Sequence, residues 1–378
     1  MRIVIDCRCV FDGCGGIGNY TRSLVQALGK VNSRDEVTLL HSSARPWHPI
    51  LDQPNARSLP VPAAMLDGDW EQFELPVLLE ELGAHLYHNP TFALPIVSPC
   101  PLVTTIHDVV FHYRPDLVEP GLCRYLQQAA ATASRVATRI ITVSEYSRQS
   151  IASAYGIDPE AIDVIYEAAD LQRFCRKYGG ALEDEFRAKH RLRGPFVLYV
   201  GSLEPKKNID RLLAAFGAIR DSIPHQLVLA GGTGGMPYDV HEAISELRLE
   251  DRVTVTGFIP DALLPVAYNA ADVFVYPSLY EGFGLPPLEA MACGVPTVVS
   301  TATSLPEVVG DAAVMVDPLD VDALAAALLR VTTDEKLRAE LAIAGPARAA
   351  EFSWQRAALQ TMQCYLKAIG VVTALPAY

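Results

Sequence analysis

The feature that most constrains this chain is an end-to-end alternation of short apolar runs with longer amphipathic stretches. Short apolar runs are typical of strands buried on both faces, and amphipathic stretches between them are typical of the helices that connect parallel strands. We predict strands at residues 3–5, 37–40, 86–88, 102–106, 140–143, 164–165, 197–200, 227–230, 253–255, 273–276, 297–299 and 313–316. Among the predicted helices are 18–29, 208–220, 261–270 and 320–330. The pattern predicts an α/β fold built on parallel sheets.

The alternation starts twice. "RIVID", followed by a glycine-rich turn, opens the first half, and "FVLYVGSLEPKKN" opens the second half in the same way. A chain of 378 residues is long enough for two domains of about 150 residues each. We therefore predict doubly wound, Rossmann-like domains at 1–170 and 196–352, joined by the charged segment 171–195. Residues 353–378 are predicted to add one more amphipathic helix.

Charge and cysteine usage exclude several classes of protein. The formal net charge of −13 argues against a broad basic surface for nucleic acid. The eight cysteines lack the paired spacing of a zinc site, so we expect free thiols in a reducing cytoplasm and no metal. No apolar run reaches about 18 residues, and the start carries no secretory leader. We therefore expect a cytoplasmic protein that does not span a membrane.

The segment 121–139 contains Arg124, Arg135 and Arg139 but no acid. Two interpretations stay open. The segment is a helix that faces an anionic membrane, or it is a helix packed in its domain with its arginines in water.

In open parallel sheets, ligands bind beyond the carboxyl ends of the strands, so polar residues that directly follow a strand carry the functional signal. The first set is Gly13, Gly15 and Gly18, which form a G-x-G-x-x-G pattern. A dinucleotide site also needs an acid at the end of the second strand, but that strand ends in Leu40-His41-Ser42. We interpret the loop as one that brings backbone amides to an anion at a helix N-terminus, with an ordinary turn as the alternative.

Two further sets follow predicted strands in the first half. His107 comes directly after a buried strand, where its imidazole could hydrogen-bond a substrate or cap the next element. Most of the pattern at Ser144 and Ser147 is explained by a helix N-cap at Ser144, with Ser147 at the third helical position, and ligand binding at this N-terminus is the alternative.

Lys206 and Lys207 lie in a loop between a strand and a helix of the second half. Adjacent like charges are unfavourable unless water screens them or an anion lies nearby. Because this loop follows a strand, we predict a phosphate group as the partner of the two lysines.

The stretch 276–300 holds two glutamates, Glu281 and Glu289, separated by an uncharged loop and the pair Pro286-Pro287. Proline suits the first turn of a helix, so the loop 282–285 should deliver the chain to a helix N-terminus with its amides open to an anion. Compensation of the helix dipole would explain Glu289 but not Glu281. A diphosphate flanked by hydroxyl-rich groups would satisfy the amides, lysines and carboxylates together.

These motifs resemble those of the retaining glycosyltransferases of family 4, and in particular bacterial polysaccharide mannosyltransferases. The resemblance rests on "EGFGLPPLE" and "YVGSLEPKKNIDRLL", with support from "GGIGNYT", "IHD", "LVLAGG" and "TGFIP". It covers nearly the whole chain and implies the GT-B architecture, which has two facing Rossmann-like domains and a cleft between them. It also implies that the last helix crosses back to the first domain.

The resemblance implies roles for individual residues. His107, Lys207 and Glu281 would be catalytic: Lys207 would clamp the diphosphate, and the other two would contact the transferred sugar. Glu289 would bind the ribose, and Phe258 would lie near the base. The implied donor-binding set is Gly16, Ser202, Lys206, Lys207, Phe258, Glu281, Gly282, Phe283, Gly284, Leu285 and Glu289. Many members have an arginine where this chain has Ser202, and Lys206 is the expected replacement.

The implied function is metal-independent, retaining transfer of a hexose from a nucleoside diphosphate sugar to a hydroxyl of a glycan or polyprenyl-linked acceptor. GDP-mannose is the first expectation for the donor, which is a substrate, and no cofactor is expected. A peripheral contact with the cytoplasmic membrane would suit the arginines of 121–139. The alternatives are an NAD-dependent oxidoreductase that uses the Gly13–Gly18 loop, a non-catalytic nucleotide-sugar-binding protein, and a phosphorylase or epimerase of the same architecture.

Overall fold

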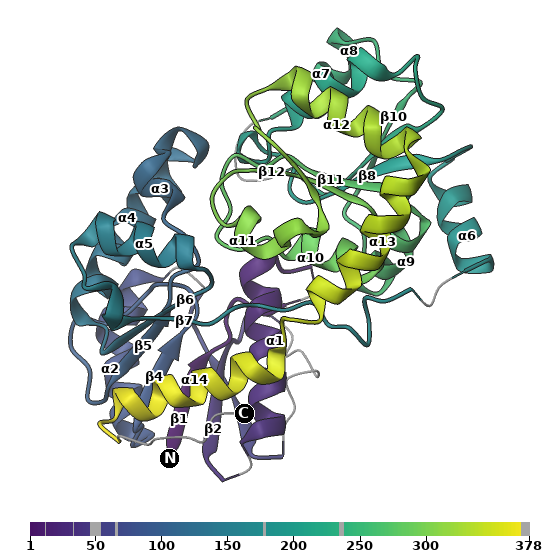
Figure 1. Cartoon of the computed structure of the whole chain (residues 1–378). Helices are drawn as coiled ribbons and strands as arrows, with labels where there is room; N and C mark the ends of the chain where they lie inside the picture. Colours follow the sequence, from purple (N-terminus) through teal and green to yellow (C-terminus); the bar gives the residue numbers. More distant parts are fainter. Residues whose placement is uncertain are drawn as a thin grey trace. The chain divides into compact units, whose positions relative to one another are not determined.

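The computed structural model describes residues 1–11, 13–32, 34–45, 54–64, 67–176, 179–233 and 238–371. The chain divides into two compact units (Figure 1). Unit 1 contains Met1–Tyr113, Pro120–Glu167 and the segment that begins at Ser353, and unit 2 contains Arg114–Glu119 and Ala168–Phe352. Each unit is built on one parallel sheet, as the alternating sequence pattern predicts.

In unit 1 the described strands pair in parallel in the order β3-β2-β1-β4-β5-β6-β7. Their bounds are β1 Arg2–Asp6, β2 Glu36–Ser42, β3 Ala56–Val61, β4 Leu86–Asn89, β5 Leu102–Thr105, β6 Arg139–Thr142 and β7 Ile162–Val164. The helices are α1 Gly16–Val31, α2 Leu75–Glu81, α3 Val110–Tyr113, α4 Pro120–Val136, α5 Glu145–Tyr155 and α14 Trp354–Ala368. A π-helical turn, Trp70–Glu74, precedes α2.

In unit 2 the order is β10-β9-β8-β11-β12-β13, again parallel. The strands are β8 Phe196–Val200, β9 Gln226–Ala230, β10 Val253–Gly257, β11 Val273–Tyr276, β12 Thr297–Ser300 and β13 Val314–Val316. The helices are α6 Ala181–Lys189, α7 Ile209–Ile219, α8 Val240–Glu246, α9 Leu264–Ala270, α10 Leu285–Ala292, α11 Leu305–Val309, α12 Val321–Thr333 and α13 Glu335–Ala349.

The strand order predicts where along the edge of each sheet a ligand binds. In unit 1 it reverses at β1, which pairs with β2 and β4, and in unit 2 it reverses at β8, which pairs with β9 and β11. Open α/β sheets bind ligands beyond the carboxyl ends of the strands at such a switch point. The loops that follow β8 and β11 in unit 2 are therefore where a ligand is expected, and they contain the predicted lysine and glutamate motifs.

One strand was not predicted. β3 pairs with β2 at the edge of the first sheet, and only its last residue, Val61, is buried. Its sequence, ARSLPV, has no apolar run, and it ends in a Pro-Val pair. Edge strands tolerate polar residues and proline because one side of the strand needs no partner, so the apolar-run criterion misses them.

The prediction that 171–195 is only a connection was incomplete. It contains α6, which packs against α9 in unit 2. Phe186 is buried, and Arg187 donates to the carbonyl of Ala270 at 2.5 Å while its guanidinium lies 5.0 Å from the centre of the Phe196 ring. The helix was not predicted because the segment is rich in charged residues and α6 buries only Phe186.

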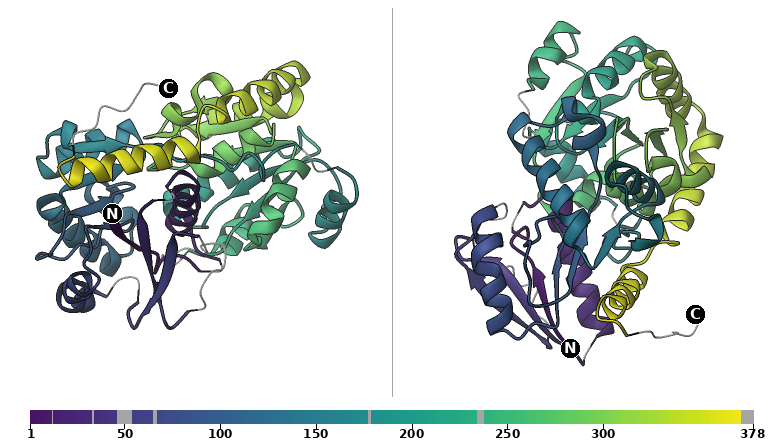
Figure 2. Two further views of the ribbon diagram at one scale, coloured as in Figure 1. Left: turned by 90° about the horizontal axis from the view of Figure 1, so that it is seen from below. Right: turned by 90° about the vertical axis from the view of Figure 1, so that its left-hand side faces the viewer.

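The last helix, α14, belongs to unit 1, where it packs against α1 (Figures 1 and 2). Ser353 caps it by accepting from the Arg356 amide. Lys367 near its end donates to Asp163 at 2.7 Å, and the buried Tyr365 hydroxyl lies 2.7 Å from His88 Nδ1. Helix α14 therefore packs as part of unit 1 although it follows unit 2 in the sequence.

Three smaller expectations concern the cysteines, Ser144 and the lengths of the helices. All eight cysteines are free, and all except Cys175 are buried. Ser144 caps α5 by accepting from the Ser147 amide at 3.1 Å, which confirms that prediction. Within the described residues, every helix is too short or too polar to cross a bilayer.

Candidate active site

The Lys207 ammonium is held at the carboxyl edge of the second sheet. Lys207 ends a short 3-10 turn after β8, and Asn208 then turns the chain with a left-handed φ of 64°. The Asn208 side chain fixes this turn by donating to the carbonyls of Pro277 and Pro318. Lys207 Nζ donates to Glu281 Oε1 at 2.6 Å and to the Tyr276 hydroxyl at 2.9 Å. The loops after β8 and β11 are therefore joined by a buried ion pair.

The Glu281 carboxylate is surrounded by donors. Lys207 and the Ser278 hydroxyl both donate to its Oε1. Its own backbone is held from the loop after β12, because its amide donates to Thr303 Oγ1 at 2.9 Å and its carbonyl accepts from Ser304. Burial alone would raise the pKa of Glu281, but the nearby ammonium groups of Lys207 and Lys206 outweigh burial and lower it. The residue is a carboxylate at neutral pH.

Lys206 provides a second positive charge at this edge. Its side chain is half-buried, and its carbonyl accepts from the Leu279 amide at 2.9 Å, which ties the two loops together. Within the described parts of the chain its ammonium forms no ion pair, so it has capacity for an anion. Ser202, where many relatives would have an arginine, donates its hydroxyl to Glu204 at 2.8 Å.

The glycine-rich loop after Glu281 ends at the N-terminus of α10. Gly284 is the N-cap residue with a φ of 118°, and a Cβ there would lie 2.7 Å from Leu305 Cδ2. The backbone angle therefore favours glycine, and a larger residue would also have to displace the end of the Leu305 side chain. Prolines occupy the next two places after Leu285, so the first turn has few N–H groups, and Leu285 supplies one of them.

The neighbouring Phe283 side chain is buried in the core of unit 2. Its ring is 3% exposed and meets Phe352 edge to face at 5.6 Å, and its carbonyl accepts from Ser304. Only the backbone of Phe283, like that of the buried Gly282, could contact a ligand. The Phe283 side chain anchors the loop in the core.

Glu289 and Phe258 lie elsewhere in unit 2. Glu289 is half-buried on α10 and accepts a hydrogen bond from the Tyr268 hydroxyl at 2.9 Å. Tyr268 is itself fully buried, so it fixes one oxygen of this carboxylate. Phe258 directly follows β10, and its side chain is 56% exposed. This exposed ring is accessible to a planar ligand.

In unit 1, His107 follows β5 and is held on both sides of its ring. Nε2 lies 3.2 Å from the carbonyl oxygen of Pro90, and Nδ1 lies 3.3 Å from Glu167 Oε1. Tyr20 packs edge-on against the ring at 4.7 Å. Glu167 was not among the residues predicted from the sequence, although it also follows a strand, β7, and lies at the same carboxyl edge of the sheet as His107.

Behind His107 runs a chain of buried hydroxyl groups and an imidazole. The Tyr20 hydroxyl lies 3.1 Å from Thr105 Oγ1, which lies 2.9 Å from His88 Nε2, and His88 Nδ1 reaches Tyr365 of α14. Burial first, and then the proximity of His107, lower the pKa of His88 to about 3. His88 is therefore neutral at physiological pH.

The glycine loop after β1 leads into α1, which begins at Gly16 with Gly15 as the N-cap. A Cβ on Gly15 or Gly16 would meet nothing within 4 Å. A Cβ on Gly18 would lie 2.4 Å from Cys14 Sγ and 2.6 Å from the carbonyl oxygen of Cys9. Gly16 thus lies in open space, where a ligand could approach the backbone, whereas Gly18 is required for packing.

A buried ionic cluster that was not predicted from the sequence precedes this loop. The Arg8 guanidinium binds Asp6 at 2.7 Å and Glu71 at 3.0 Å, and it stacks 4.4 Å from the centre of the Trp70 ring. Tyr87 also donates to Asp6 at 2.9 Å. Burial raises the pKa of Glu71 to about 7, although the charge of Arg8 opposes this shift. The cluster anchors the start of the glycine loop to β4 and to the turn before α2.

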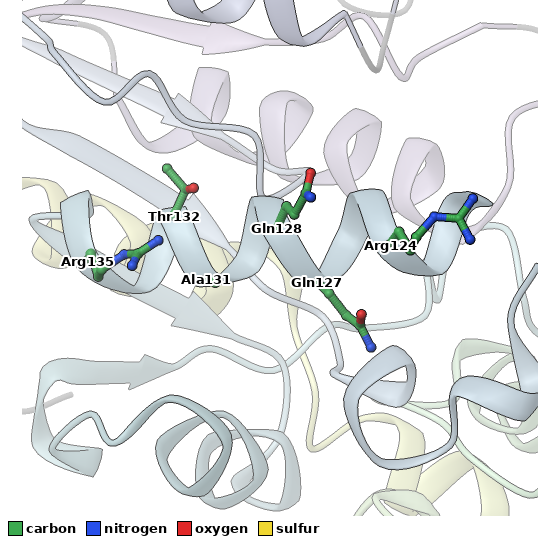
Figure 3. A pocket seen from close by; sticks show the side chains of 6 residues that line it. All are labelled: Arg124, Gln127, Gln128, Ala131, Thr132 and Arg135. Carbon is green, nitrogen blue, oxygen red and sulfur yellow. The ribbon is translucent and has the colours of Figure 1, made fainter. Parts of the chain in front are cut away.

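The acid-free segment forms α4 and one neighbouring strand residue. Arg124 and Arg135 line a shallow hollow along α4 together with Gln128, Ala131 and Thr132 (Figure 3). Arg139 does not contribute to it, because this residue begins β6 and binds Asp163 at 2.9 and 2.8 Å. The exposed positive charge of this segment therefore comes from two arginines instead of three.

Comparison with known proteins gives matches over both halves. The family described as "Glycosyltransferase Family 4" matches residues 14–173, and the family described as "Glycosyl transferases group 1" matches residues 182–348. The chain is 33% identical over 370 residues to O-antigen chain mannosyltransferase B of Escherichia coli, covering 93% of this chain and 95% of that protein. It is 30% identical to the MMP alpha-(1->4)-mannosyltransferase of Mycolicibacterium hassiacum, with 96% and 97% covered.

Solved structures share the fold. Sucrose-phosphate synthase from Thermosynechococcus elongatus aligns with a TM-score of 0.80 at 24% identity, over 98% of this chain and 100% of that one. Anabaena HepE in complex with UDP and glucose aligns with a TM-score of 0.77 at 22% identity, over 97% and 100%. The chain belongs to the GT-B glycosyltransferases of family 4, glycosyl transferases group 1.

Proposed function

We propose that this glycosyltransferase moves a hexose, with mannose as the first candidate, from a nucleoside diphosphate sugar to a hydroxyl of a glycan or lipid-linked glycan. The observation that carries the proposal is the buried Lys207–Glu281 pair, which lies at the switch point of the second sheet. The relatives of this chain that are named mannosyltransferases support mannose as the transferred sugar, and GDP-mannose is then the expected donor.

The proposed chemistry needs positive charge where the leaving diphosphate becomes more negative. Lys206, Lys207 and the N–H groups of Gly284 and Leu285 at α10 are the groups that would supply it. A divalent cation has the same task in other phosphate-transfer sites. Because these fixed charges are already present in the protein, we propose that the reaction runs without a metal ion.

The proposed reaction retains the configuration at the anomeric carbon. The bond between that carbon and the phosphate oxygen breaks, and its electron pair leaves with the diphosphate. The acceptor oxygen then bonds to the carbon on the same face, and the acceptor proton passes to the departing phosphate oxygen. Glu281 would accept hydrogen bonds from sugar hydroxyls at its Oε2. Glu289 would bind the ribose, and Phe258 would contact the base. In unit 1, Gly16 and His107 would contact the diphosphate and the sugar.

The acceptor side is proposed to lie on unit 1. The hollow along α4 exposes Arg124 and Arg135 and hydrogen-bonding amides (Figure 3). These groups suit the phosphate of a polyprenyl-linked glycan, and they support a cytoplasmic enzyme that contacts the inner membrane face peripherally.

Thermal melting in the presence of GDP, UDP, dTDP or ADP tests the donor, because a ligand that binds the native state raises the melting temperature. GDP is expected to give the largest rise. Incubation with GDP-mannose and chelator should then give slow release of GDP, and the product linkage seen by NMR should keep the donor's anomeric configuration. No response to any nucleotide would contradict the proposal. A strong response without turnover with any acceptor or water would favour a non-catalytic binding protein.

A further inference from the structure

The two oxygens of the Glu281 carboxylate are not equivalent. The hydrogen bonds from Lys207 Nζ and the Ser278 hydroxyl both go to Oε1, and the Tyr276 hydroxyl also faces this carboxylate. A carboxylate can accept about four hydrogen bonds, two at each oxygen. Oε1 is thus occupied by two protein donors, and Oε2 is the oxygen that we expect to accept from a substrate hydroxyl.

The Ser278 hydroxyl has little freedom to move. Ser278 is completely buried, and its carbonyl accepts from the Ser300 hydroxyl at 2.6 Å. Ser300, at the end of the adjacent strand β12, is also completely buried. The bond from Ser278 therefore fixes the rotation of the Glu281 carboxyl group from a rigid part of the sheet.

Tyr276 constrains the other member of the pair. Its hydroxyl lies 2.9 Å from Lys207 Nζ, and the ammonium lies 5.3 Å from the centre of its ring. The ring is stacked on Tyr199 at 5.9 Å and on Phe274 at 6.1 Å, so the hydroxyl cannot swing away. An ammonium has three N–H groups. Tyr276 and Glu281 take two of them, which leaves one for an anion.

We propose that Ser278 and Tyr276 are positioning residues that act on different halves of the donor. Ser278, through Glu281, aligns the carboxylate oxygen that receives the sugar. Tyr276, through Lys207, aligns the N–H group that receives the diphosphate. The inference rests on the proposed function and deepens it, because it assigns one buried hydroxyl to each side of the bond that breaks.

The test compares Ser278→Ala and Tyr276→Phe with Thr297→Val as a matched control. Thr297 is completely buried in the same sheet, but its hydroxyl bonds the carbonyl of Val295. Two quantities are measured for each variant: the Kd of the nucleoside diphosphate that gives the largest thermal shift, and kcat/KM for sugar transfer. Melting temperatures check folding, and Ser278→Gly is a second hydroxyl-free variant should Ser278→Ala be unstable.

Loss of the Ser278 hydroxyl should lower kcat/KM at least about tenfold and leave the diphosphate Kd within about twofold, since a hydrogen bond to a charged group contributes about 1.5–3 kcal/mol. Tyr276→Phe should weaken diphosphate binding about three- to tenfold. Thr297→Val should change neither quantity. Wild-type kcat/KM in both Ser278 variants, or equal losses of diphosphate affinity in Ser278→Ala and Tyr276→Phe, would overturn the inference. A wild-type protein that binds no nucleotide would instead overturn the proposed function.

Discussion

Lys207 and Glu281 come from loops after two adjacent strands and meet through a single contact of 2.6 Å between Nζ and Oε1. Each side chain is only about one-tenth exposed. In the absence of substrate, the cation proposed for the diphosphate and the carboxylate proposed for the sugar therefore neutralise each other. A donor that binds here must share Lys207 with Glu281, which places the two contacts on neighbouring parts of the same ligand.

Removing one partner of this pair should destabilise the protein more than removing both. Lys207→Met leaves Glu281 buried without its cation, which should cost about 3–5 kcal/mol. Adding Glu281→Gln to that variant removes the stranded charge and should recover part of the loss. Chemical denaturation of the two single variants and the double variant gives the coupling energy. Additive losses would show that the pair contributes nothing as a unit.

Glu289→Ala should weaken binding of the nucleoside diphosphate at least about tenfold and leave binding of inorganic pyrophosphate unchanged, because Glu289 is proposed to hold only the ribose. Titration calorimetry with both ligands separates the two effects. Tyr268→Phe removes the hydroxyl that orients Glu289 and should give a smaller loss of the same kind. Equal weakening of both ligands by Glu289→Ala would place this residue on the phosphates.

Glycines of the loop after β1 should respond differently to substitution. Gly18→Ala puts a methyl group 2.6 Å from the carbonyl oxygen of Cys9, a backbone atom that cannot move freely, so a loss of about 1–3 kcal/mol in stability is expected. Gly16→Ala meets open space and should change stability by less than about 1 kcal/mol. Denaturation curves of the two variants measure the difference. A stable Gly18→Ala protein would contradict the packing described for α1.

Acid should destabilise unit 1 through His88. Its folded pKa is about 3, below the usual 6.5, so the unfolded chain takes up a proton as the pH falls below about 6.5 while the folded protein does not. Above that pH the folded protein is not destabilised by this residue. Below it the free energy of unfolding falls progressively, and the loss amounts to about 2 kcal/mol at about pH 5. His88→Gln cannot titrate.

The measurement is the change in unfolding free energy between about pH 7.5 and pH 5. It should be larger for the wild type than for His88→Gln, whatever the difference between the two proteins at neutral pH. Parallel curves would mean that His88 titrates normally in the folded protein.

Much of the fold could be predicted, because buried parallel strands leave a continuous apolar signature. β1 and β8 are examples, with Ile3, Val4 and Ile5 each only 1% exposed and Val197 and Leu198 completely buried. β3 and α6 gave weaker signals, since an exposed edge strand and a helix with one buried residue retain a polar sequence.

In the candidate site, Lys207 and Glu281 could be selected because they follow strands and carry charge that a core would not tolerate alone. Tyr276 and Ser278 could not be selected from the sequence. A tyrosine at the end of a buried strand resembles an ordinary core residue, and a serine beside a proline resembles an ordinary turn residue. Their roles depend on where their hydroxyls point, which only the tertiary structure fixes. Glu167 carried a detectable signal, because it follows β7 at the edge where His107 lies.

The central claim is that Lys207 holds the diphosphate of the donor and that Glu281 competes for Lys207 when the site is empty. The most direct test is the affinity of the wild type, Lys207→Met and Glu281→Gln for the nucleoside diphosphate without its sugar. Lys207→Met should bind at least about tenfold more weakly, since one charge-assisted contact contributes about 1.5–3 kcal/mol. Glu281→Gln should bind as tightly as the wild type or more tightly, because its Lys207 is released from the ion pair. Unchanged binding by Lys207→Met, or a loss of similar size in Glu281→Gln, would contradict the account.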